Sequence, residues 1–187
     1  MTAKIKLNSA SGGGSFSIQA PSSSSNNRVF TLPDSADATL LTSTSATGKV
    51  LQVVSATSTT AVSSSSASHT DTGLSCSITT TSASNKVYVS VSQALYVRNP
   101  SGDTASISWD LVRGSTVISD GSSNIILRSE AYSPYVLTAQ MASFVYLDSP
   151  ASAATHTYKT TALTNSGNWK AQDNSTPSHI VLMEIEA

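Results

Sequence analysis

Charged side chains are scarce in this chain of 187 residues. They occupy 11% of positions, whereas soluble domains average about 25%. Lys and Arg number 10 and Asp and Glu 11, so the formal net charge is -1. Without an excess of cations the chain lacks the electrostatic footprint of a nucleic-acid-binding or anionic-membrane-binding protein. We therefore expect no nucleic-acid partner and no membrane partner, and a surface kept soluble by hydroxyl groups.

The chain has a single cysteine and no long hydrophobic run. Cys76 is the single cysteine, which excludes an intrachain disulfide and a thiolate metal site and is typical of a reducing compartment. No apolar run approaches the roughly 20 residues of a membrane-spanning helix. The first residues lack the apolar core of a signal peptide. We expect synthesis in the cytoplasm without a cleaved leader.

Patterns that carry chemistry are weak or incomplete. The three glycines at 12–14 lack the lysine and the following helix of a phosphate-binding loop. His69 and Asp71 could supply two metal ligands, but no third is near in sequence, so we expect both to be solvated. Glu184 and Glu186 could form the carboxylate pair of a glycosidase, yet their place on one strand face near the C-terminus favours the surface. The sequence predicts no enzyme, no cofactor and no metal.

Residues 49–187 alternate between apolar and polar side chains in short segments separated by turn residues, which is typical of half-buried antiparallel strands. The Ser-rich stretches 63–66 and 82–84 are expected to be loops, and residues 113–115 a tight hairpin turn. The expected strands cover residues 49–54, 74–79, 87–91, 107–111, 116–118, 125–127, 135–137, 144–147, 156–160 and 179–185. About nine or ten such strands predict an all-β sandwich or jelly roll.

Residues 1–48 have a different composition. Only two short pieces, around 5–7 and 29–32, are apolar, and 15–18 has the pattern of a strand. So few apolar side chains cannot offset the entropy of ordering about 40 residues. We expect an extended arm that folds against another molecule, which could be another subunit.

The aromatic residues crowd into the second half of the chain, and Tyr88 alternates with Val87 and Val89. If the valines face the core, the tyrosine faces outward, and such a face suits a subunit interface or the stacking of a carbohydrate. The alternative is that each tyrosine packs singly at a sheet edge. The residues assigned to this trimer or ligand surface are Tyr88, Tyr96, Trp109 and Tyr135.

Two groups of motifs resemble virion proteins of tailed phages. The first group resembles a module at the front of such proteins, particularly those of cyanophages; it spans residues 4–42 and includes Lys4-Ile5-Lys6-Leu7-Asn8, Ala20-Pro21, Val29-Phe30-Thr31-Leu32-Pro33-Asp34 and Thr39-Leu40-Leu41-Thr42. The second group resembles the jelly-roll domain of phage fibre and head-decoration proteins; it comprises residues 48–54, 70–79, 84–89 and 181–185.

The resemblance implies a homotrimer whose N-terminal arms dock on the particle. Because the chain has one arm module and no heptads, collagen-like repeat or β-helical shaft, a compact protein on the outer capsid is favoured, namely a decoration or cement protein that staples neighbouring capsomers of major capsid protein. The alternative is a short tail or head fibre or spike that binds host surface glycans. The residues assigned to docking are Lys4, Ile5, Lys6, Leu7, Phe16, Ile18, Val29, Phe30 and Leu32.

Overall fold

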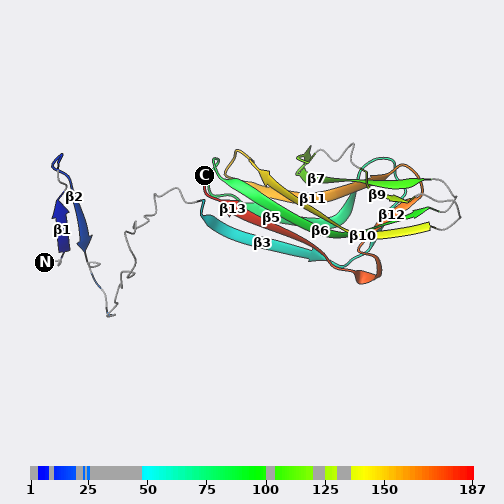
Figure 1. Cartoon of the computed structure of the whole chain (residues 1–187), viewed down its shortest axis with the longest axis horizontal. Coiled ribbons are helices and arrows are strands. Elements are labelled where there is room, and N and C mark those ends of the chain that lie inside the picture. The colour runs from blue at the N-terminus through cyan, green and yellow to red at the C-terminus, as the bar shows by residue number, and fades with distance from the viewer. Residues whose placement is uncertain are drawn as a thin grey trace. The chain divides into compact units, whose positions relative to one another are not determined.

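The chain divides into two compact units, Met1–Thr42 and Ser43–Ala187. The boundary expected from the sequence, after residue 48, lies a few residues later. The computed structural model describes residues 4–8, 11–19, 23, 25, 48–99, 104–119, 125–129 and 136–187, and these contain strands, turns and one short 3-10 helix but no α-helix (Figure 1). The expected all-β class is confirmed.

In the first unit the described strands form an antiparallel hairpin of β1 (Lys4–Asn8) and β2 (Ser15–Gln19). The strand expected at 15–18 is therefore confirmed. The turn contains Gly12 at φ 90° and Gly13 at φ 69°, a backbone region that glycine adopts without steric cost. The glycine-rich stretch is thus part of a hairpin turn.

The second unit contains two antiparallel sheets. The larger has β10, β6, β13 and β3 as neighbours, with β12 and β4 continuing beside the later part of β6. The smaller has the order β5-β11-β7, with β8 and β9 both paired to β7. The larger sheet consists of β3 (Val50–Ser58), β4 (Val62–Ser64), β6 (Lys86–Asn99), β10 (Val136–Asp148), β12 (Asn168–Ala171) and β13 (Ser178–Ile185). The smaller consists of β5 (Thr70–Thr79), β7 (Ala105–Arg113), β8 (Thr116–Val117), β9 (Ile125–Ser129) and β11 (Thr155–Thr164).

Most expected strands are present, and two expectations are wrong. The described part of the segment expected at 135–137, residues 136 and 137, and the segment 144–147 belong to one strand, β10, because all thirteen residues of β10 continue the antiparallel ladder with β6. Part of the Ser-rich stretch 63–66 is β4, which pairs with β12 despite its polar composition. The hairpin expected at 113–115 is confirmed, with Gly114 at φ 59° in its turn.

The core lies between the two sheets and draws on both. The alternating apolar residues of β5 and β6, such as Leu74, Val87 and Val89, are buried as expected. Trp109 of β7 is buried too, with 6% of its surface exposed, so its assignment to a trimer or ligand surface is wrong. The alternation of β7 directs Trp109 inward, and its indole N–H donates to Gln93 Oε1 at 2.7 Å.

Gly73 in β5 is a position where only glycine fits. Its φ is +81°, and an added Cβ would lie 2.9 Å from Cγ2 of Val62 in β4. We expect Gly73→Ala to lower the free energy of unfolding by about 2 kcal/mol, because the backbone is strained and the β-branched Val62 has little freedom to move. Gly114→Ala is the control, since φ is +59° there but nothing lies within 4 Å of the added Cβ. Equal losses in urea denaturation would contradict the role of the Val62 contact.

Candidate interaction surfaces

The outer face of the larger sheet carries a continuous apolar row. Strand alternation buries Val87 and Val89 and turns Tyr88 outward. Across the strands, the register places Leu147 of β10 beside Tyr88, Tyr88 beside Met183 of β13, and Met183 beside Val53 of β3. The row therefore crosses four neighbouring strands without a polar residue.

A second row lies next to the first on the same face. It runs Val145, Ser90, Val181, Ser55 across the same four strands. We call the apolar members of the two rows, Val53, Tyr88, Val145, Leu147, Val181 and Met183, the apolar band. Val53 is 56% exposed, Val145 57% and Leu147 50%. Contiguous exposed apolar residues of this kind mark interaction surfaces, because they are costly to leave in water.

The outer face of the smaller sheet is polar by contrast. On β5 and β11, Ser77 hydrogen-bonds Thr157 and Thr79 hydrogen-bonds Thr155, both at 2.8 Å. One step further along, Lys159 forms an ion pair with Asp71 at 2.8 Å. The outer faces of the two sheets arise from the same alternating pattern but differ in composition. The polar outer face of the smaller sheet suits contact with solvent, and the apolar outer face of the larger sheet suits contact with a partner.

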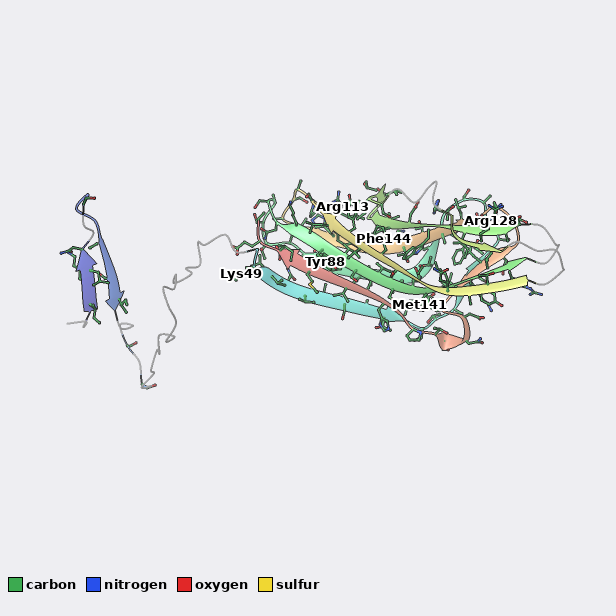
Figure 2. All side chains as sticks on the ribbon, viewed as in Figure 1. Lys49, Tyr88, Arg113, Arg128, Met141 and Phe144 are labelled. Atoms are coloured by element: carbon green, nitrogen blue, oxygen red, sulfur yellow. The ribbon has the colours of Figure 1, made fainter. Side chains whose placement is uncertain are left out.

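The apolar band lies toward the end of the sandwich at which the N-terminal segment enters. There the backbone N–H of Glu186 donates to the carbonyl of Lys49 at 2.9 Å, which fixes the chain entry beside the end of β13. Figure 2 shows Tyr88 toward the end that carries Lys49, with Met141 farther along the sandwich. Gly48 and Lys49, the first described residues of the second unit, therefore lie at the end of the larger sheet that carries the apolar band.

Glu184 lies beneath the apolar band, inside the sandwich. It is completely buried, so its expected surface position is wrong: β13 turns the odd residue Met183 outward and Glu184 inward. Asn85 Nδ2 donates to Glu184 Oε1 at 2.7 Å, and Gln52 Nε2 donates to Oε2 at 2.6 Å. The backbone N–H and hydroxyl of Thr81 also donate to Oε1.

The hydrogen bonds decide the ionisation state of Glu184. Burial raises the pKa of its carboxyl, but the donors of Asn85, Gln52 and Thr81 outweigh burial and hold that pKa at about 2. The carboxylate is thus ionised at neutral pH, and it joins β13 to β3 and to the β5–β6 connection. Its role in the structure is to position the strands that carry Val53 and Met183.

Tyr96 lies apart from Tyr88, near the later part of β6. It lines a groove of about 320 Å³ whose other lining residues are Ala94, Leu95, Ala139, Gln140, Met141, Asp173, Asn174 and Thr176. The three last-named residues belong to or adjoin the 3-10 helix η1 (Asp173–Ser175). The structure thus divides the tyrosine surface expected from the sequence into an apolar band and a mixed groove. Tyr135 lies outside the described residues.

The β1–β2 hairpin presents a second apolar surface. Ile5 and Leu7 are 65% and 57% exposed, and Ile18 is 54% exposed. The register pairs Ile5 with Ile18 and Leu7 with Phe16, while Lys4 pairs with Gln19 and Lys6 with Ser17 on the alternate positions. A two-stranded hairpin alone is marginally stable in water, and an uncovered apolar face lowers its stability further. Of the other predicted docking residues, Val29, Phe30 and Leu32 lie outside the described part of the chain.

The histidines have structural partners. His69 Nε2 lies 3.3 Å from Asp110 Oδ2, and its Nδ1 lies 3.2 Å from the hydroxyl of Thr161. This order of acid, imidazole and hydroxyl is that of a hydrolase triad, but Thr161 is only 7% exposed, which closes its hydroxyl to a substrate. Both His69 and Asp71 were expected to be solvated. Asp71 is exposed and forms an ion pair with Lys159, whereas His69 is half-buried against Asp110 and Thr161.

Sequence reasoning missed the partner of His69 and the groove at Tyr96. Asp110 is far from His69 in sequence, and η1 reaches the outer face of β6 only through the fold, so no local spacing signals either one. Among the described residues no three or more His, Cys, Asp or Glu side chains cluster in a way that could hold a metal ion.

Within the described part of the chain, no helix has the length and apolar character needed to cross a membrane. No protein-family model matches the sequence, and a comparison with curated proteins finds no match.

Proposed function

We propose that this chain is a non-enzymatic structural subunit of a phage virion, a trimeric jelly-roll decoration protein of the outer capsid. Copies associate through the apolar band, and the N-terminal hairpins dock on the major capsid protein. The observation that carries the proposal is the hairpin, the described part of the first unit (Met1–Thr42), whose apolar residues Ile5, Leu7 and Ile18 are all more than half exposed. Apolar residues left this exposed on a described hairpin form a surface that suits a partner.

Multivalency explains how so small a hairpin can hold a subunit on a particle. Each hairpin offers few apolar side chains, so one copy binds weakly. When three hairpins are joined by one assembled base, the second and third bind at a high effective concentration, and avidity can exceed single-site affinity by about 10²–10⁴-fold. The position of the chain entry beside the apolar band supports this arrangement, because assembly there gathers the arms.

The test is binding of the full chain to particles that lack it, with two substitutions at neighbouring positions. Ile18→Asp places a charge on the apolar face of the hairpin, and we expect at least a tenfold loss of particle binding. Ser17→Asp adds the same charge at an exposed position on the other face and should bind as the parent does. Both variants should keep the parent's oligomeric state.

Equal binding of Ile18→Asp and the parent would overturn the docking role of the hairpin. Copy number in purified virions, measured by quantitative mass spectrometry against the major capsid protein, tests the location. A ratio near one in a few capsid subunits supports decoration of the capsid. A few copies per particle would contradict it in favour of a fibre or spike.

A further inference from the structure

We propose that the groove around Tyr96 binds a neutral sugar ring. Its volume of about 320 Å³ falls within the roughly 300–1,000 Å³ of small-molecule sites. One side is the outer face of β6 and β10, where the register sets Ala139 beside Tyr96 and Met141 beside Ala94. The other side is η1 and the residue that follows it. This inference goes beyond the assembly role and does not depend on it.

The lining residues favour a ligand that is uncharged and both apolar and polar. The two alanines leave space next to the aromatic ring of Tyr96, which offers a flat apolar surface. Asn174 and Thr176, both exposed, supply neutral groups that can both donate and accept hydrogen bonds. A sugar ring has C–H groups on its faces and hydroxyls around its edge, so it can use both sets of groups at once.

The charge of the groove argues against ionic ligands. Its single charged lining residue is Asp173, and the carboxylate of Asp173 accepts a hydrogen bond from Lys170 Nζ at 2.8 Å. A bound anion would therefore meet this carboxylate, and the neighbouring cation, Lys170 beside Tyr96 in the ladder, is already paired with it. A bound cation would have to compete with Lys170, and a wholly apolar ligand would cover the amide of Asn174 without giving it a partner.

The η1 side of the groove is held in an unusual conformation. Gln172, Asn174 and Ser175 have φ values of 53°, 51° and 59°, in the left-handed region that costs non-glycine residues about 1–3 kcal/mol each. The buried Gln172 anchors this segment: its backbone N–H donates to the Ala94 carbonyl at 3.1 Å. The side-chain amide nitrogen of Gln172 faces the Thr72 carbonyl, and its amide oxygen accepts a hydrogen bond from Ser178 Oγ at 3.0 Å. Because the groove is already formed, binding needs little further ordering of the protein, and this low entropic cost favours the binding of weak ligands such as sugars.

The experiment is saturation-transfer NMR on the full chain with four neutral disaccharides, namely lactose, maltose, cellobiose and N,N′-diacetylchitobiose, and with the anionic 3′-sialyllactose. We expect at least one neutral disaccharide to bind, with transfer strongest to the ring C–H protons. Tyr96→Ala should weaken that binding at least tenfold, because it removes the stacking surface, whereas Tyr96→Phe should retain it. Ala139→Leu should weaken it similarly by filling the groove while Tyr96 stays in place.

Tyr146→Ala is the matched control, because Tyr146 is a partly exposed tyrosine that stacks on Phe144, away from the groove lining. It should bind the disaccharide as the parent does. Circular dichroism and sedimentation of each variant establish that fold and assembly are kept. The proposal is overturned if no neutral disaccharide binds, if binding survives both Tyr96→Ala and Ala139→Leu, or if only the anionic sugar binds.

Discussion

Val145→Glu is expected to convert the assembled protein into single chains of 19.3 kDa. Val145 lies in the second row of the apolar band and is 57% exposed in the isolated chain, so the fold itself tolerates a charge there. In an assembly that covers the band, the same carboxylate is buried without a partner. Such a charge costs about 3–5 kcal/mol, which raises a dissociation constant by roughly 10²–10³-fold for each contact.

Sedimentation equilibrium over a range of micromolar concentrations measures this effect. Ser77→Glu is the control, since Ser77 is exposed at the centre of the polar outer face of β5 and has its hydroxyl bonded to Thr157. It adds the same charge and should leave the assembly intact. A parent protein that sediments at 19.3 kDa, or a Val145→Glu variant that sediments at three times this mass, would contradict association through the apolar band.

The strand pattern is the part of the fold that the sequence predicts well. Leu74, Cys76 and Ile78 alternate with polar residues because β5 has one buried and one solvent-exposed face, and this period of two is visible without any knowledge of the partner strand. The same reasoning does not predict the middle of β10. Its residues 138–143 are small or polar except for Met141, so they show no apolar alternation, and the ladder with β6 keeps them extended.

Which face of a strand points to the core is harder to predict than the presence of the strand. Sequence alternation places Tyr88 outward because its valine neighbours define an inside. In β7 the alternation of Ile107, Trp109 and Leu111 with polar residues places Trp109 inward in the same way, and its assignment to a surface went against this pattern. Alternation does not reveal that the polar face of β7, with Ser108 and Asp110, is buried as well. Glu184 is expected on the surface from its place on one strand face with Glu186 near the C-terminus. The four donors that compensate it come from β3 and from the β5–β6 connection, whose approach no local pattern indicates.

The candidate surfaces also differ in how far the sequence predicts them. The hairpin residues Ile5, Leu7 and Ile18 were expected to dock because the arm has too few apolar residues for a core, which is a matter of composition. The groove at Tyr96 depends on η1, whose strained backbone is fixed by the buried Gln172. Composition thus indicates that a partner is needed, whereas the shape of the site that receives it depends on contacts distant in sequence.

Glu184→Leu is expected to lower the free energy of unfolding at pH 7 by about 3–5 kcal/mol, because it removes the charged acceptor of four hydrogen bonds that Gln52, Thr81 and the buried Asn85 donate. Glu186→Leu, two residues further on and only partly buried, is the control and should change stability by less than about 1 kcal/mol. Urea denaturation of the two variants beside the parent measures both values. Equal losses would contradict the structural role assigned to the carboxylate of Glu184.

The pH dependence provides an independent check on the same carboxylate. Its pKa is lowered from 4.5 to about 2 in the folded chain, so the ionised form stabilises the fold fully above pH 4.5. Protonation removes this contribution progressively as the pH falls from 4.5 toward 2. The stability difference between the parent and Glu184→Leu should therefore shrink over that interval, whereas the difference for Glu186→Leu should show no such loss. A parent-to-Glu184→Leu difference that stays constant down to pH 2.5 would mean that packing, and not the ionised carboxylate with its donors, holds β13 against β3 beneath the apolar band.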